Sequence, residues 1–422
     1  MLKQLQVNEQ IVLVPLASEL HEPKSVKDAV SAYRRWLKGC FDYEMQPASR
    51  LSIEESRRIK SAAGILALVI TGGSERVIQS VVQSGPPTII LTHESMNSLP
   101  AAIEGLSSIE AENQPQLIAS RTRAELQKVR QFANAARAFA RIRNHRVGLV
   151  GGPSPWLTYS LPDGSELSRF LGIKLIDIPM DEFRQAYEAA SESVVAKLTA
   201  GARSKHALPS EVTAEDFRRS CRIYAAIRTL AEKHDLTAVS LKCFDFLADY
   251  KASGCYAVAK LNDEDLVAGC EGDIPATTAM IVLSEVSAYP AFMANPCFVK
   301  GHNLVLAHCT IAPRLTTKYE YRTHFESGLG VALAGTLRKG KRVTVARFIR
   351  MIDVLRAGEG VVVRGEARSE KLCRTQAEIR MDGDAELIKD HPLGNHYALT
   401  YGEHVSTLRS LASFAGMKFE EI

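Results

Sequence analysis

Short apolar runs alternate with longer amphipathic segments along the first part of this 422-residue chain. The apolar runs include Ile11 to Leu16, Ile65 to Thr71 and Thr88 to Thr92, and helix-like stretches lie at Val26 to Leu37 and Arg121 to Arg143. Such alternation is typical of an open, mostly parallel α/β sheet. We therefore predict an α/β domain over residues 1–145.

The alternation of apolar runs and amphipathic segments continues in the middle of the chain, and a different pattern begins near its end. Apolar runs at Arg146 to Gly151, Leu266 to Ala268 and Asn303 to Ala307 predict a second α/β sheet ending near residue 312. From Gly328 onward, short strands separated by glycine-bearing turns indicate a small barrel or sandwich. The predicted fold class is α/β, with two Rossmann-like doubly wound parallel-sheet domains (1–145 and 146–312) followed by a β-rich, barrel-like C-terminal domain (313–422).

Composition excludes several classes of protein. Hydrophobic residues make up 46% of the chain and charged residues 24%, as in ordinary globular proteins, and no apolar run approaches the roughly 20 residues that a bilayer requires. The first residues lack the apolar core of a secretory signal, so a cytoplasmic protein is expected. A net charge of +4 is too small to indicate nucleic-acid binding, and we expect neither a nucleic-acid nor a membrane partner. The eight scattered cysteines include no CxxC pair, which argues against a disulfide framework and a thiolate zinc site.

Two carboxylates separated by one residue follow the apolar run Leu266 to Ala268. Glu271 and Asp273 precede a helix-like stretch, so they are expected at the carboxyl end of a strand, where α/β proteins place their chemistry. A backbone turn at Gly272 would let both carboxylates reach one centre, because glycine has no Cβ to resist it. Carboxylate oxygens with one or two imidazoles suit Mn²⁺, Mg²⁺ or Co²⁺. We predict a divalent-metal site here.

Two histidines in distant segments complete the predicted site. His308 ends the apolar text Val-Leu-Ala-His-Cys, and His396 lies in Gly-Asn-His-Tyr. Alone, a histidine on an apolar strand is more often a core residue than a ligand. Together with the carboxylates, however, the pattern favours Glu271, Asp273, His308 and His396 as metal ligands.

The loop after the apolar run at 146–151 also draws attention. Gly152-Pro153-Ser154-Pro155-Trp156 is similar to a ligand loop, although a plain strand-to-helix turn that needs glycine explains it as well. The two prolines do not fit a dinucleotide fingerprint, which requires helix formers behind its glycines. NAD binding is therefore not expected.

The texts Ala-Gly-Cys-Glu-Gly-Asp, Gly-His-Asn-Leu-Val-Leu-Ala-His-Cys and Leu-Gly-Asn-His-Tyr resemble the L-fucose/L-arabinose isomerase superfamily, especially its fucose isomerase-like members. The resemblance implies two Rossmann-like domains, a β-rich C-terminal domain, and a trimer or hexamer. It also implies Mn²⁺-dependent interconversion of an aldose and a ketose through a cis-enediol. By similarity, Glu271 is a ligand and base, His308 an imidazole at the site, and His396 a ligand from the C-terminal domain.

One position departs from the arabinose-isomerase pattern. A second glutamate is expected in a Phe-Met-Glu-Asp text, where this chain has Phe292-Met293-Ala294-Asn295. Asp273 is then the residue expected to supply the second carboxylate, beside Glu271, and Asn295 is a neutral oxygen ligand or a substrate contact. Either the bases are rearranged or isomerase activity has been lost.

Substrate contacts and alternative functions stay open at this point. His308 and Asn295 are expected to contact the substrate, and Arg314 could meet an anionic group on it, as could Arg322 or Lys242, although each could equally be an ordinary surface or interface charge. The leading hypothesis is a sugar ketol-isomerase, an intramolecular oxidoreductase, acting on a monosaccharide. A sugar-binding or regulatory protein without catalysis, or another metal-assisted enolisation of the aldolase or dehydratase kind, are the alternatives.

Overall fold

The computed structural model describes residues 7–110, 114–161, 164–203, 209, 211–367 and 369–422. These residues form two compact units, one of residues 7–141 with 413–416 and the other of residues 142–412 with 417–422. Within the described ranges no helix is long and apolar enough to cross a membrane.

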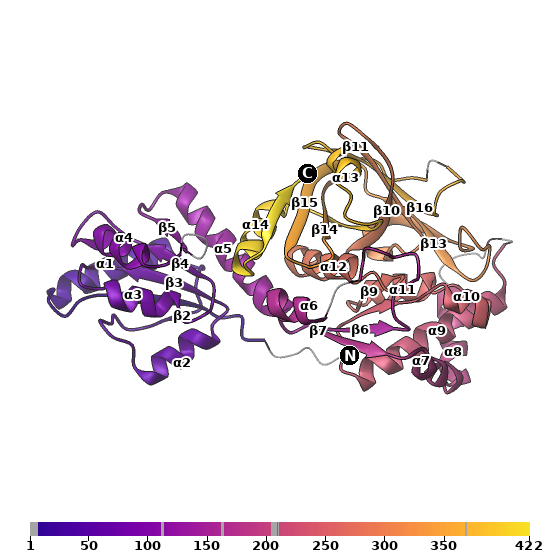
Figure 1. The fold of residues 1–422 in the computed structure, drawn as a ribbon, viewed down its shortest axis with the longest axis horizontal. Coiled ribbons are helices and arrows are strands. Elements are labelled where there is room, and N and C mark those ends of the chain that lie inside the picture. The colour runs from indigo at the N-terminus through magenta and orange to yellow at the C-terminus, as the bar shows by residue number, and fades with distance from the viewer. Residues whose placement is uncertain (1–6, 111–113, 162–163, 204–208, 210, 368) are drawn as a thin grey trace. The chain divides into compact units, whose positions relative to one another are not determined.

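The first unit is built on a five-stranded parallel sheet with the strand order β2-β1-β3-β4-β5 (Figure 1). Its central strands, β1 (Ile11–Leu16) and β3 (Gly64–Val69), are buried along their whole length, which is why they appear in the sequence as uninterrupted apolar runs. Separate apolar clusters pack on the two faces of the sheet. The remaining elements are β2 (Tyr43–Glu44), β4 (Thr88–Leu91), β5 (Gln116–Ile118), α1 (Pro23–Trp36), α2 (Ile53–Ser61), α3 (Glu75–Val82), α4 (Ser98–Ser107) and α5 (Arg123–Ile142).

The second unit begins with a four-stranded parallel sheet. Its order is β7-β6-β8-β9, and these strands are β6 (Arg146–Val150), β7 (Lys174–Ile178), β8 (Ala238–Leu241) and β9 (Val267–Cys270). The helices that accompany it are α6 (Gly164–Leu171), α7 (Met180–Glu188), α8 (Glu192–Arg203), α9 (Ala214–Lys233), α10 (Asp245–Tyr250) and α11 (Cys255–Asp263). Both units therefore have the parallel α/β texture that the sequence predicts.

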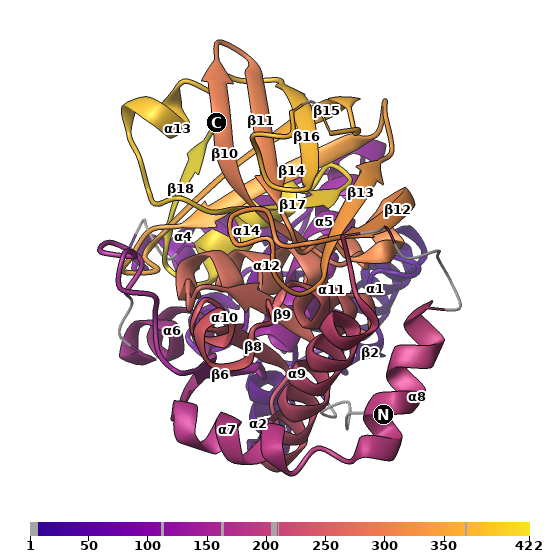
Figure 2. The same ribbon diagram turned by 90° about the vertical axis from the view of Figure 1, so that its right-hand side faces the viewer.

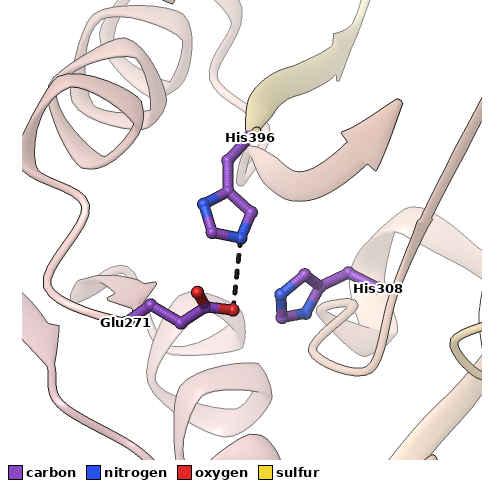
Figure 3. A group of neighbouring side chains, drawn as sticks. All are labelled: Glu271, His308 and His396. Carbon is purple, nitrogen blue, oxygen red and sulfur yellow. Dashed lines mark ion pairs between the residues drawn. The ribbon is translucent and has the colours of Figure 1, made fainter. Parts of the chain in front are cut away.

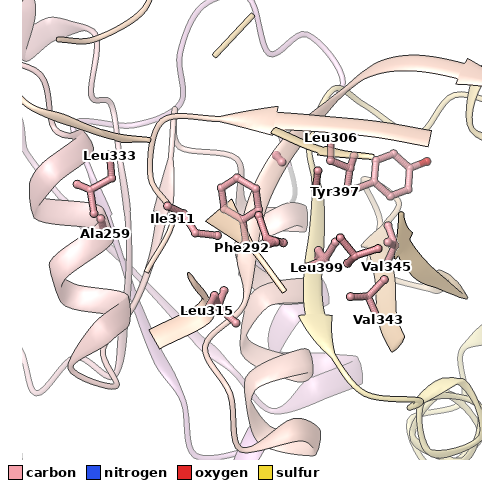
Figure 4. Packing of buried hydrophobic residues seen from close by; sticks show 14 of the residues in the cluster. Ala259, Phe292, Leu306, Ile311, Leu315, Leu333, Val343, Val345, Tyr397 and Leu399 are labelled. Atoms are coloured by element: carbon pink, nitrogen blue, oxygen red, sulfur yellow. The ribbon is translucent and has the colours of Figure 1, made fainter. Parts of the chain in front are cut away.

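An antiparallel sheet forms the rest of the second unit. Its order is β14-β17-β10-β11-β16-β15-β18, and β14 also pairs with β15, so that six strands close into a barrel. Apolar side chains from these strands fill the interior, as Figure 4 shows around Phe292, Leu306 and Leu399. The elements are β10 (Phe292–Lys300), β11 (Asn303–His308), η2 (Pro313–Leu315), β12 (Thr316–Arg322), β13 (Ala332–Leu337), β14 (Arg342–Phe348), β15 (Val354–Arg364), β16 (Thr375–Met381), α13 (Leu387–Asp390), β17 (Tyr397–Tyr401), α14 (Val405–Phe414) and β18 (Lys418–Glu421).

Helix α12 (Ile274–Ser287) joins the two layers of this unit (Figure 2). It packs on β8 and β9 of the parallel sheet and on β10, β14 and β17 of the barrel. Residues 274–283 are all buried, as expected for a helix that is apolar around its whole circumference. The carboxyl end of β9 therefore faces barrel strands that lie far away in sequence.

The expectation that Asn303 to Ala307 continue the second parallel sheet is wrong. These residues form β11, which pairs antiparallel with β10 and β16 inside the barrel. A turn at Gly301, whose φ of 56° lies in the left-handed region, makes β10 and β11 a hairpin. No division between compact units falls at the predicted boundary near residue 312.

Candidate metal centre

Three side chains from distant segments meet inside the second unit (Figure 3). Glu271 follows the last residue of β9, His308 is the last residue of β11, and His396 immediately precedes β17. One donor atom from each lies within 4.8 Å of the others, and all three residues are buried. The group could hold a metal ion.

A tight turn places Glu271 in this group. Glu271 has a φ of 62° and Gly272 a φ of 71°, so the chain reverses in the left-handed region between β9 and α12. A Cβ on Gly272 would lie 2.5 Å from Cα of Pro153, which leaves room only for glycine. Asp273 then caps α12, accepting a hydrogen bond of 3.0 Å from the Ala276 N–H.

The two carboxylates converge on one imidazole from opposite sides. Nδ1 of His396 lies 3.0 Å from Oδ2 of Asp273, and Nε2 lies 3.4 Å from Oε1 of Glu271. Because an ionised carboxylate can only accept, Nδ1 carries the proton shared with Asp273. The Nε2 atom is buried, and no described residue forms a hydrogen bond with it. In metal sites, a histidine that binds the ion through one ring nitrogen commonly donates the N–H of the other nitrogen to a carboxylate, which fixes the orientation of the ring. The hydrogen bond between His396 and Asp273 has this arrangement.

Asp273 is thus placed behind His396 and not within the group of three. Its carboxylate also pairs with the guanidinium of Arg347, at 3.1 Å, and both side chains are fully buried. Arg347 donates further hydrogen bonds to the Ser160 hydroxyl at 2.7 Å and to the carbonyl oxygens of Leu393 and His396. This geometry favours a supporting role for Asp273 over the predicted role as a ligand.

The local charges set the protonation of the group. Burial would lower the pKa of His396, but the hydrogen bond with Asp273 and the negative charges of Asp273 and Glu271 raise it to about 9. Burial and the nearby His396 lower the pKa of His308 to about 4. Burial opposes ionisation of Asp273, yet the Arg347 charge and His396 lower its pKa to about 2. The pKa of Glu271 is also lowered, mainly because His396 and the Trp156 N–H outweigh its burial.

The loop after β6 reaches the same carboxylate. Nε1 of Trp156 donates a hydrogen bond of 2.6 Å to Oε2 of Glu271, and the Ser154 N–H donates one of 2.7 Å to the Glu271 carbonyl oxygen. The sequence left this loop as either a ligand loop or a simple turn. The structure places it against the candidate centre.

Two predicted substrate contacts lie away from the group. Asn295 pairs with Ala307 in the β10–β11 register, and because side chains alternate along a strand, Asn295 lies on the opposite face from His308. Arg314 forms ion pairs with Asp263 and Asp265, which precede β9, whereas Glu271 follows that strand. Arg322 likewise pairs with Glu211 and Glu370. None of these three side chains joins the described centre.

Sequence reasoning missed Arg347 and gave Trp156 no role. The sequence does contain a pattern that could have identified Arg347. Val343, Val345 and Arg347 are spaced two residues apart, so in a strand all three point to the same, buried face of β14. For Trp156 the signal is weaker. Trp156 follows β6, and Glu271 follows β9 in the same sheet, with β8 between the two strands. A glycine-proline turn before Trp156 indicates a site only when this strand order is known.

Fold and site together define a mixed α/β and barrel protein. Its buried carboxylate follows a parallel strand, and its two imidazoles come from the antiparallel barrel. Comparison with known proteins finds similarity to three sulfoquinovose isomerases. The chain is 21% identical over 312 residues to the protein of Clostridium sp. (strain MSTE9), covering 70% of this chain and 69% of that one. It is 21% identical over 300 residues to those of Priestia aryabhattai and Priestia megaterium (strain ATCC 12872 / QMB1551), covering 68% of this chain and 66% of each relative.

No family model matches the chain. The relatives' names nevertheless support an isomerase enzyme, in line with the resemblance seen in the sequence motifs.

Proposed function

We propose that this protein is a metal-dependent aldose-ketose isomerase of the fucose/arabinose isomerase-like superfamily, acting on a monosaccharide through a cis-enediol. The observation that carries the proposal is the meeting of Glu271, His308 and His396 in one buried group. The similarity to sulfoquinovose isomerases supports the same class of reaction. We also propose a cytoplasmic homo-oligomer, a trimer or hexamer, which light scattering of the purified protein would test.

The donor set fits a divalent cation. The Nε2 atom of His396 is buried without a hydrogen-bond partner among the described residues, and the low pKa of His308 keeps that imidazole neutral, as a metal ligand must be. Arg347 balances the charge of Asp273, and a bound cation would take the place of the His396 proton beside the ionised Glu271. One carboxylate oxygen and two imidazoles suit Mn²⁺, with Mg²⁺ or Co²⁺ as alternatives. When bound, such an ion would polarise sugar oxygens and stabilise negative charge on them.

Glu271 is the residue proposed to move the proton. Its carboxylate is ionised, buried and held by the Trp156 N–H, so it can take the proton from the carbon beside the carbonyl and return it to the neighbouring carbon. One such group suffices for the carbon-bound proton of a cis-enediol, because both carbons present their hydrogens on the same side, while the hydroxyl proton passes from O2 to O1 of the sugar. The alanine and asparagine at 294–295 are then compatible with turnover. Asp273 keeps the His396 imidazole oriented, and Arg347 holds Asp273 in place.

Sulfoquinovose is the first substrate to test, because it is the sugar in the relatives' names. Lys242 is the cation that we propose for binding an anionic group on the sugar. Lys242 follows β8 as Glu271 follows β9, and Leu241 and Cys270 pair in register. Its ion pair with Asp245, at 3.2 Å, is partly exposed and weak enough to be exchanged for a substrate anion.

Hydrogen exchange tests the proposal directly. The Mn²⁺-loaded protein is incubated in D₂O with sulfoquinovose, L-fucose and L-arabinose, and loss of the C2 proton signal is followed by NMR. We expect exchange with at least one sugar, and Glu271→Gln should abolish it without unfolding the protein. Glu285→Gln, on the far end of α12, is the matched control. Full exchange in Glu271→Gln would refute the assignment.

A further inference from the structure

Trp156 combines a buried polar tip with an exposed ring. Its indole N–H is hydrogen-bonded to Glu271 at 2.6 Å, yet the residue is 49% exposed to solvent. The ring therefore extends from the candidate centre outward. Tryptophan is well suited to such a position, because one end of the side chain is polar and the rest is apolar.

The surrounding backbone is built to hold this position. Gly151 and Gly152 both have φ near 80°, in the left-handed region, and they turn the chain from β6 toward the Glu271 turn. The close approach of Pro153 to Gly272 and the hydrogen bond from the Ser154 N–H to the Glu271 carbonyl then join the two loops. A loop that served only to connect β6 with α6 would not need these contacts.

An aromatic side chain fixes the ring in turn. Phe244 meets Trp156 edge-on, with ring centroids 4.8 Å apart and an interplanar angle of 81°, and His324 meets Phe244 in the same manner at 5.6 Å. Edge-on aromatic pairs are favourable beyond their buried area, by about 0.5–1.5 kcal/mol. The indole is therefore supported on one side and open to solvent elsewhere.

We infer that Trp156 is a positioning residue with two tasks. Its N–H orients the Glu271 carboxylate, and its exposed ring forms a platform on which the apolar C–H face of a sugar stacks beside that carboxylate. The inference rests on the proposed isomerase function and deepens it, because it assigns the wall of the substrate site. Ligand sites commonly combine such an aromatic wall with a few placed polar groups.

Two substitutions separate the tasks. Trp156→Phe removes the N–H but keeps an aromatic ring, so kcat should fall about 10- to 100-fold, as for loss of a hydrogen bond to a charged group, with KM little changed. Trp156→Ala removes both, so KM should also rise about 3- to 10-fold. Trp36→Phe, in the other unit, is the control for loss of a tryptophan. An unchanged kcat in Trp156→Phe, or equal KM values in the two variants, would overturn the inference.

A binding measurement is independent of turnover. The chain has two tryptophans, so Trp36→Phe leaves Trp156 as the sole reporter. Titration with sulfoquinovose, L-fucose or L-arabinose should change its emission in a saturable manner. An emission change without isomerisation would support the platform and refute the isomerase. Turnover without any emission change would do the reverse.

Discussion

His396 lies between two carboxylates, and this position sets how the centre responds to pH. Its pKa of about 9 means that the metal-free centre carries a proton on His396 at pH 7, whereas His308, with a pKa of about 4, carries none. A bound cation must replace that one proton. Mn²⁺ binding at pH 7 should therefore release about one proton, and the apparent affinity should rise about tenfold per pH unit from pH 6.5 to 8.5.

Calorimetric titration in buffers of different ionisation enthalpy measures the released proton. Asp273→Asn removes one of the charges that raise the pKa of His396, so this variant should release less than the native protein at pH 8. Release of two protons, or an affinity independent of pH, would contradict the assigned protonation.

Strand β14 carries a charge into the barrel wall. Arg347 and Asp273 are both fully buried, and removing one partner leaves the other charge uncompensated. Arg347→Met should therefore lower the free energy of unfolding by about 3–5 kcal/mol, measured by urea denaturation. Arg342→Met, on the same strand but in a partly exposed network with Asp382 and Glu403, should cost only about 0–1 kcal/mol. Equal losses in the two variants would show that the buried pair has no special role.

The elements also show what the sequence could predict. The apolar runs at 11–16, 65–71 and 146–151 overlap β1, β3 and β6, because a parallel strand that is buried on both faces leaves an uninterrupted apolar run in the sequence. An apolar run does not state which sheet it joins, and this is why β11 was assigned to the wrong sheet. Likewise, the alternation of side chains along β14 predicts that Arg347 points into the barrel. The sequence around Arg347 does not identify Asp273, 74 residues earlier, as its ion-pair partner.

At the scale of the molecule, the centre belongs wholly to the second unit. The sequence brought Glu271, His308 and His396 together only as motifs, since the pairing of β10, β11 and β17 that makes them neighbours is a long-range property. Mn²⁺ should therefore stabilise the unit of residues 142–412 and leave residues 7–141 unaffected. At about 100 times the dissociation constant, the gain is about 2.7 kcal/mol.

Thermal unfolding followed through single tryptophans tests this difference. Trp156 emission, in Trp36→Phe, should report a higher midpoint with Mn²⁺ and a lower one with a chelator. Trp36 emission, in Trp156→Phe, should report no change at a Mn²⁺ concentration that calorimetry shows to saturate this variant. Glu271→Gln in the Trp36→Phe background should abolish the shift. A shift of the Trp36 signal as large as that of Trp156 would show that the two units unfold together.

The long sequence separation between Asp273 and His396 affects the order in which the centre forms during synthesis. Asp273 and His396 are 123 residues apart in sequence, so the imidazole that orients the centre emerges from the ribosome long after the parallel sheet. Loop closure over such a distance is slow compared with local folding. Until the barrel closes, Asp273 can cap its helix but has neither Arg347 nor His396 beside it, and the nascent chain has no complete centre with which to capture a metal ion.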